Sequence, residues 1–209
     1  GGVGGEHAVA MLDVLFLVVV VAFGVALSAL AYFVALQVRY PEPAHAHEIH
    51  IVSTPDHWLL RLHRRKPASG VGEPVFFMHS LASNHLNFEV PHGFSLVDYL
   101  ANAGYDCWTF DSRACRDAVS PRRSMRFTST VDDLLVNDIP AAVRHIREVT
   151  GHSRVHWVGH SMGGMSVQAA LLGQPALARH VRGIVLVSTS ATMGFFPVPR
   201  ALVEFALGD

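Results

Sequence analysis

The sequence has few charged residues and few cysteines. Only 16% of its 209 residues are charged and 50% are hydrophobic, whereas about 25% charged residues are usual in soluble domains. This composition excludes an intrinsically disordered chain. The formal net charge of -1 provides no excess of basic residues, so no nucleic-acid partner is expected. Two cysteines in the whole chain also exclude a disulfide scaffold.

Charge is absent altogether from one long segment near the N-terminus. Residues 14–38, from Val14 to Val38, carry no charged side chain and are almost all apolar. A helix rises about 1.5 Å per residue, so this segment is long enough to cross a hydrocarbon core of about 30 Å. We predict a single transmembrane helix here, with the bilayer as a partner. A buried core helix and a cleaved signal peptide are the alternatives, and the absence of Lys and Arg before the segment disfavours the latter.

This helix divides the chain into parts. We predict an N-terminal segment at 1–13, the transmembrane helix at 14–38, a linker at 39–47, a main domain at 48–190 and a further apolar segment at 191–209. The protein is thus expected to be a single-pass membrane protein, with the side of its main domain undetermined. Three histidines near the linker (His45, His47 and His50) do not have a recognised ligand spacing. We therefore expect no metal and no cofactor.

The main domain alternates between apolar runs and helical patterns. We predict strands at 48–54, 58–65, 74–80, 105–111, 154–158 and 184–188. Helices are predicted at 94–103, from Pro140 to Gly151, and at 162–173. The first two strands form a hairpin around Pro55-Asp56. A hairpin followed by alternating strands and helices indicates an α/β fold whose sheet becomes parallel after its first strands.

A G-x-S-x-G motif lies between the fifth strand and the last helix. It is formed by Gly159, His160, Ser161, Met162 and Gly163. A serine at a sharp strand-to-helix turn takes strained backbone angles, and the flanking glycines remove side chains that would clash around it. The helix that starts after Ser161 directs its first N–H groups toward the place where an oxyanion would form. We predict a nucleophile elbow, the alternative being a Gly-rich turn with an inert serine.

Together with three further motifs, the elbow resembles the lysosomal acid lipase-like branch of the α/β-hydrolase superfamily. The others are the strand and His79 loop at 76–84, the segment 101–108 with its continuation at 111–114, and the helix start at 138–141. The resemblance spans roughly 48–190. It implies an α/β-hydrolase fold, with a mostly parallel sheet flanked by helices, incomplete at its C-terminus and preceded by one transmembrane helix.

The resemblance also implies roles for individual residues. Ser161 would be the nucleophile, and Leu81 and Met162 would supply the N–H groups of the oxyanion hole. The remaining elbow and supporting residues would be His79, Gly159, His160, Gly163 and Gly164, with the ring of His160 pointing away from the serine.

Two pairs of positions modify this pattern. Ser80 and Ala114 each stand where the family usually has glycine, and we expect Ser80 to weaken oxyanion binding without abolishing it. Arg113 and Asp138 are expected to form a structural ion pair beneath the site, unless they are ordinary solvated charges.

The catalytic acid and base are missing from the expected order. In this fold the nucleophile is followed by Asp or Glu and then by His. After Ser161 the only histidine is His180, and both acidic residues, Glu204 and Asp209, follow it. We therefore expect the triad acid and histidine to be absent from this chain, which would make it a fragment. The segment 191–209 is either the start of a cap or an ordinary helix packed on the sheet.

These observations predict a membrane-anchored carboxylic ester hydrolase with a serine nucleophile. A lipid ester or another ester would be its substrate, cleaved through an acyl-enzyme. Two alternatives remain open. An acyltransferase of the same fold would pass the acyl group to an alcohol, and a non-catalytic pseudo-hydrolase would serve as a membrane-tethered interaction module.

Overall fold

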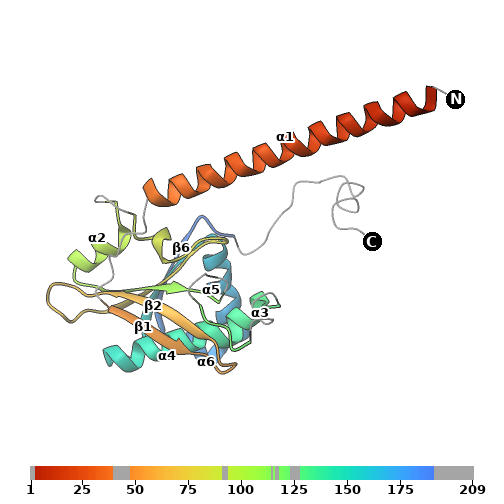
Figure 1. Ribbon diagram of the computed structural model, residues 1–209. Coiled ribbons are helices and arrows are strands. Elements are labelled where there is room, and N and C mark those ends of the chain that lie inside the picture. The colour runs from red at the N-terminus through yellow and green to blue at the C-terminus, as the bar shows by residue number, and fades with distance from the viewer. Residues whose placement is uncertain are drawn as a thin grey trace. The chain divides into compact units, whose positions relative to one another are not determined.

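The computed structural model describes residues 3–39, 48–90, 94–113, 115, 118–122 and 128–190 (Figure 1). The chain divides into two compact units, Gly1–Ala44 and His45–Asp209. Most of the predicted linker, Ala114, and all of the predicted cap segment at 191–209 lie outside the described residues.

The first unit contains one continuous helix, α1 (Val3–Arg39). It includes the whole predicted span and begins before it. Its section Val14–Leu36 is long and apolar enough to cross a membrane, and none of that section is buried in the protein. The hydroxyl of Ser28 donates to the carbonyl of Gly24 at 2.8 Å, so this polar group is satisfied within the helix. By length and composition α1 is either a membrane span or a signal sequence.

The second unit is built on a six-stranded sheet with the order β1-β2-β4-β3-β5-β6. Its strands are β1 (Glu48–Ser53), β2 (Leu59–Arg65), β3 (Pro74–Met78), β4 (Asp106–Asp111), β5 (Val155–His160) and β6 (Val181–Val187). Strand β2 is antiparallel to both β1 and β4, whereas β4, β3, β5 and β6 are parallel to one another. The predicted change from an antiparallel hairpin to a parallel sheet is confirmed.

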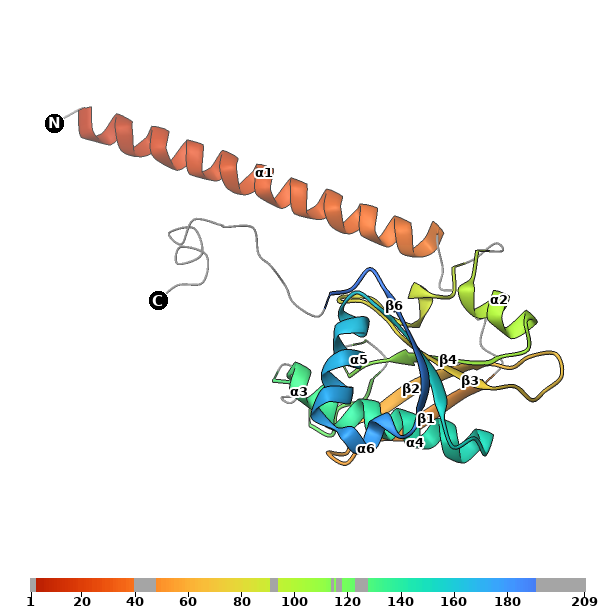
Figure 2. The same cartoon turned by 180° about the vertical axis from the view of Figure 1, so that it is seen from behind.

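Helices cover both faces of the sheet (Figure 2). Apolar residues of α4 (Ile139–Thr150) and α5 (Met162–Gly173) form one core with the side chains of one sheet face. Helix α2 (Leu96–Asn102) packs on the other face, where its buried residues meet Phe77 of β3 and Cys107 of β4. Shorter elements are η1 (His85–Asn87), α3 (Val131–Asp133), a π-helical turn η3 (Leu134–Asp138) and α6 (Pro175–Ala178). This arrangement is a doubly covered α/β layer structure.

Local sequence signals set the ends of helices α4 and α2, whereas strand pairing sets the start of β6. Helix α4 has Pro140 in its first turn and ends at Gly151, whose φ of 72° is left-handed. Helix α2 begins after Ser95, whose hydroxyl accepts the N–H of Asp98 at 3.0 Å. Strand β6 begins at Val181, earlier than predicted, because its backbone already pairs with β5 at Val181 and Gly183, before the apolar run.

Helix α5 approaches β3 so closely that no side chain fits between them. A Cβ atom added to Gly163 would lie 2.2 Å from the carbonyl oxygen of Met78. A backbone atom cannot give way as the end of a flexible side chain can, so the helix would have to move. At the other end of the same helix, a Cβ added to Gly173 would meet no atom within 4 Å.

We therefore expect Gly163→Ala to lower the free energy of unfolding by about 1–3 kcal/mol. Gly173→Ala is the matched control, and it should leave stability unchanged or raise it by up to about 1 kcal/mol, because alanine favours helix. Urea titration followed by tryptophan fluorescence measures both, since Trp58, Trp108 and Trp157 are all buried. Equal stability of the two variants would contradict the close approach of α5 to β3.

The open end of the β1–β2 hairpin carries a charged cluster. The carboxylate of Glu48 accepts hydrogen bonds from Lys66 and from Nη1 of Arg64, the latter at 2.9 Å. These contacts, with that of Lys66 the largest, lower the pKa of Glu48 from 4.5 to about 2, although partial burial alone would raise it.

The folded pKa is lower than the unfolded one, so Glu48 stabilises the fold above about pH 4.5, and this contribution is lost as the pH falls through about 2. Glu48→Gln should therefore destabilise the protein at pH 7 and have a smaller effect at pH 2.5, as measured by urea titration. Glu148→Gln is the control, because Glu148 is exposed and lies 4.0 Å from Arg144. It should change stability little at either pH. A loss of stability in Glu48→Gln that is equal at pH 7 and pH 2.5 would contradict the lowered pKa of Glu48.

Candidate active site

Ser161 lies at the sharp turn between β5 and α5. Its backbone angles, φ 51° and ψ −118°, are rare for a residue with a side chain and cost on the order of 1–3 kcal/mol. Hydrogen bonds hold this conformation on both sides. The Ser161 N–H donates to the carbonyl of Val187 at 3.0 Å, and the hydroxyl of Thr189 donates to the Ser161 carbonyl at 2.9 Å. The end of β6 thus supports the strained turn.

The residues around Ser161 pack backbone against backbone. A Cβ on Gly159 would lie 2.6 Å from the Cα of Gly164, so the strand can pass under the first turn of the helix only without a side chain there. The N–H of Gly164 donates to the Ser161 carbonyl at 3.0 Å. The ring of His160 lies against Asn87, with Nδ1 at 3.0 Å from its Oδ1. This geometry matches a nucleophile elbow.

Two backbone amides near Ser161 are available for an oxyanion. Leu81 and Met162 line the same cavity as Ser161. Among the described residues, neither of these two N–H groups donates to an acceptor. Met162 is the first residue of α5, so its amide belongs to the unpaired N-terminal turn of a helix. The position after Leu81 is also unusual, because Ala82 has a φ of 54°.

The loop that carries Leu81 is tied to the elbow by one side chain. Oδ1 of Asn87 accepts the backbone N–H of Ser80 at 3.0 Å and lies 3.0 Å from Nδ1 of His160. An amide oxygen can only accept hydrogen bonds, so the Nδ1 atom of His160 must carry the proton that it donates to Asn87. Asn87 therefore links the loop after β3 to the end of β5. The Ser80 amide, being occupied, is not available to an oxyanion.

His79 fixes the start of the same loop. Its Nδ1–H donates to the carbonyl of Ser80 at 2.8 Å, which leaves Nε2 as an acceptor. Nε2 receives the N–H of Ser112 at 3.5 Å and lies 3.5 Å from Sγ of Cys115. Burial lowers the pKa of His79, which keeps the imidazole neutral, as its accepting role requires.

Beside Ser161 there is a cavity of about 580 Å³. Its walls are mainly apolar. They comprise Leu81, Val131, Ser161, Met162, Met165, Ser166, Gln168, Ala169, Leu172 and Ser190. A cavity of this size is comparable to pockets that hold small organic ligands. It brings the serine and both available amides to one space.

Arg113 forms a buried ion pair with Asp138, the last residue of η3 before α4 begins. Nη2 of Arg113 lies 2.5 Å from Oδ1 of Asp138, and the side chains of both are nearly inaccessible. Asp56, from the turn between β1 and β2, adds a second carboxylate at 2.8 Å from Nη1. Burial alone would lower the pKa of Arg113, but the hydrogen bonds that its guanidinium donates to both carboxylates raise it. The guanidinium also stacks on Trp58, 5.1 Å from the ring centroid.

Sequence reasoning missed Asp56 and Asn87. The sequence places Asp56 in a hairpin turn, and nothing in it marks the contact with Arg113 across 57 positions. Asn87 lies in a loop where an asparagine is unremarkable. Within the described ranges, no histidine forms a hydrogen bond with the Ser161 hydroxyl. The structure thus brings Ser161 together with two residues whose amides have no acceptor, and shows no hydrogen-bonded histidine beside that serine among those residues.

Comparison with known proteins agrees with this geometry. A family model described as the alpha/beta hydrolase fold matches residues 73–207. Human gastric triacylglycerol lipase is 30% identical over 179 residues, covering 76% of this chain and 45% of the lipase. Human lysosomal acid lipase/cholesteryl ester hydrolase is 29% identical over 166 residues, covering 74% of this chain and 42% of that protein. The chain thus spans less than half the length of these curated relatives.

Solved structures share the fold at lower identity. An epoxide hydrolase of Vigna radiata has a TM-score of 0.56 at 19% identity, covering 79% of this chain and 46% of its own. An esterase of Rhodococcus has a TM-score of 0.53 at 21% identity, covering 70% of this chain and 47% of its own. The family model covers well over half of the chain, and the strand order agrees with it, so the chain belongs to the α/β-hydrolase fold family.

Proposed function

We propose that this chain supplies the nucleophile and the oxyanion hole of a carboxylic ester hydrolase. The observation that carries the proposal is the strained Ser161, which shares one cavity with the unpaired amides of Leu81 and Met162. Relatives named as lipases and esterases support the same type of reaction. The strained serine alone would not support the proposal, because an oxyanion hole requires the amides and the serine to border the same space.

In this proposal each group has a defined role. Oγ of Ser161 attacks the ester carbonyl carbon, and the carbonyl oxygen becomes an oxyanion held by the N–H groups of Leu81 and Met162. Collapse of this intermediate breaks the ester C–O bond and releases the alcohol, leaving an acyl group on Ser161. Water then attacks the acyl carbon and releases the carboxylic acid.

The proton from Ser161 must pass to a general base. Such a base is a histidine oriented by an acid, and in this fold both follow the nucleophile in the chain. The curated relatives are more than twice as long as the part that this chain matches. We propose that the histidine and the acid come from the part of the full-length protein that corresponds to the remainder of these relatives, outside the region matched here.

A lipid ester is the proposed substrate. The cavity wall beside Ser161 is formed mainly by apolar side chains, among them Met165 and Leu172 from α5 and Val131 from α3. An acyl chain gains about 0.8 kcal/mol for each buried CH₂ group, so such a wall favours long acyl groups over short ones. We further propose that α1 is a membrane span, which would keep the domain near lipid substrates.

A fluorophosphonate probe tests the nucleophile in the full-length protein. We expect the probe to label Ser161. The substitution Ser161→Ala should abolish the label and lower the rate of ester hydrolysis by on the order of 10³-fold or more. Ser69→Ala is the control, because Ser69 is exposed and bonds only to the carbonyl of Val71. It should leave labelling unchanged. A label found on another serine in the unsubstituted protein would refute the assignment of Ser161.

Alkaline carbonate extraction of cell membranes tests the role of α1. We expect the protein to stay in the membrane pellet with peptides of 14–36 present in its mass spectrum. Val20→Arg combined with Val21→Arg should release it, because each charge at the centre of a span costs about 2.5–3.5 kcal/mol. Val71→Arg, at an exposed site of the second unit, should not. A soluble mature protein that lacks the peptides of α1 would show instead that α1 is a cleaved signal sequence.

A further inference from the structure

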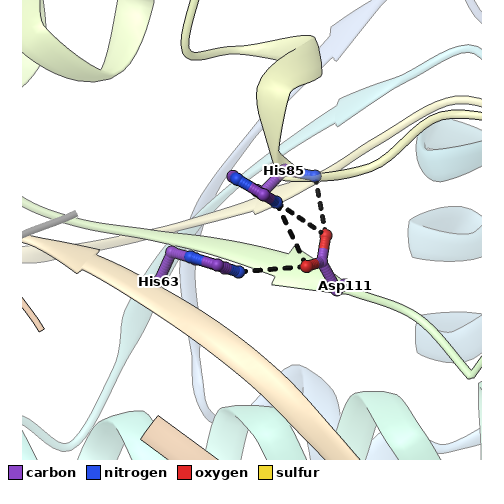
Figure 3. A group of neighbouring side chains, drawn as sticks. All are labelled: His63, His85 and Asp111. Carbon is purple, nitrogen blue, oxygen red and sulfur yellow. Dashed lines mark hydrogen bonds and ion pairs between the residues drawn. The ribbon is translucent and has the colours of Figure 1, made fainter. Parts of the chain in front are cut away.

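Two histidines and an aspartate meet in the interior of the second unit (Figure 3). His63 comes from β2, His85 from the start of η1, and Asp111 from the end of β4. Asp111 is 48 residues from His63 and 26 from His85 in the sequence. None of the three belongs to the elbow or lines the cavity beside Ser161.

The sheet and one loop create this juxtaposition. In the antiparallel pairing of β2 with β4, His63 is opposite Thr109. Side chains two residues apart on a strand point to the same face, so Asp111 lies on the same face as Thr109 and His63. The loop after β3 then crosses this face and places His85 above the carboxylate, as the close-up shows (Figure 3).

The three side chains are close enough to share one ligand. Nε2 of His63 lies 3.0 Å from Oδ2 of Asp111, and Nδ1 of His85 lies 3.1 Å from both carboxylate oxygens. One ligand atom of each residue lies within 4.8 Å of the other two. The side chains of His63, His85 and Asp111 are only 8%, 10% and 3% exposed.

We propose that His63, His85 and Asp111 form a binding site for a divalent late first-row transition metal ion, of which Zn²⁺ is the representative. The donor set is two imidazole nitrogens and one carboxylate oxygen, which suits such ions. Mg²⁺ and Ca²⁺ prefer sites made mainly of oxygen atoms, and this cluster offers only one carboxylate. Around a tetrahedral Zn²⁺, ligand atoms at about 2.0–2.2 Å from the metal lie roughly 3.3–3.6 Å from one another, so the carboxylate and the rings would have to move only slightly apart from their present separations of 3.0 and 3.1 Å.

The ring arrangement defines what must change when an ion binds. The imidazoles of His63 and His85 stack with centroids 3.8 Å apart and planes 14° apart. Their in-plane lone pairs therefore do not converge, and at least one ring must turn about its Cβ–Cγ bond. The protons now shared with Asp111 move to the other ring nitrogens, so that both histidines bind as neutral ligands. A water molecule would complete a four-coordinate site.

The bound ion would have a structural effect near the elbow. His85 begins the turn that contains Asn87, and this turn belongs to the loop that carries Leu81. An ion held by β2, β4 and this loop would fix the loop to the sheet more firmly than hydrogen bonds alone. The metal site itself does not depend on ester hydrolysis, so it is tested by metal binding rather than by activity.

The expectation of a metal-free protein rests on sequence spacing, which singles out only the histidines near the linker. The ligands proposed here are scattered along the chain and meet only through strand pairing. No motif of short spacing could have indicated them.

Zinc binding to the full chain, purified in detergent and stripped with a chelator, tests the proposal. Titration calorimetry with Zn²⁺ should show one site in the unsubstituted protein. Asp111→Asn, which keeps the shape of the side chain but removes its charge, should weaken that site by about 100-fold or more, since even a partner behind a ligand accounts for 10–100-fold. His156→Gln is the matched control, because His156 pairs with Glu73 elsewhere on the sheet. It should leave the affinity unchanged.

A second measurement avoids dependence on how the variant folds. X-ray absorption at the zinc edge of the unsubstituted protein should show two imidazole ligands at about 2.0–2.1 Å and oxygen ligands for the remainder. Circular dichroism without metal checks the fold of Asp111→Asn. The proposal is overturned if no stoichiometric site exists, if a folded Asp111→Asn binds Zn²⁺ as tightly as the unsubstituted chain, or if the zinc shell contains sulfur or only oxygen. The cluster would then be a hydrogen-bonded ionic group without a metal.

Discussion

The close approach of α5 to the carboxyl end of β3 is the constraint on which the site depends. Because Gly163 lies against the carbonyl of Met78, the helix starts directly above the parallel strands. The chain must then turn from β5 into α5 within a single residue, and that residue is Ser161, with its positive φ. The same geometry directs the first amide of the helix to the cavity. Strain at the serine and availability of the amide thus have one cause, and the packing of the helix on the sheet offsets the cost of that strain.

The loop after β3 is positioned by polar contacts rather than by packing at its tip. Leu81 is 73% exposed, so burial of its side chain does not hold its amide in place. Instead the loop is held at three points, by Asn87 against the elbow, by His79 against Ser112, and by His85 against Asp111. The last contact includes the backbone N–H of His85, at 2.8 Å from Oδ1 of the carboxylate. Hydrogen bonds to charged groups are stronger than neutral ones, which makes Asp111 the firmest of these anchors whether or not a metal ion joins it.

Much of the fold and the centre of the site are predictable from the sequence because their signals are local. A proline and a glycine bound α4, and five consecutive residues define both the elbow and the first amide of α5. Features that arise from strand pairing leave no such signal. Pairing with β5 extends β6 by three residues before its apolar run, starting at Val181, and the register of β2 and β4 brings His63 and Asp111 together. A short motif carries no information about register. Sequence reasoning therefore reaches the strained serine but not the polar groups that support its surroundings.

The direction of the strands explains why the cavity lies beside Ser161. Strands β3, β5 and β6 are parallel, so their carboxyl ends meet at one edge of the sheet, where α/β proteins place their ligands. The last residue of β6, Val187, already bonds to Ser161, and Ser190 lines the cavity three positions later. The chain therefore leaves the sheet at the cavity wall. The turn at Ser161 and this wall of the cavity are therefore set by the same strand end, because Val187 and Thr189 hold the turn and Ser190 borders the cavity.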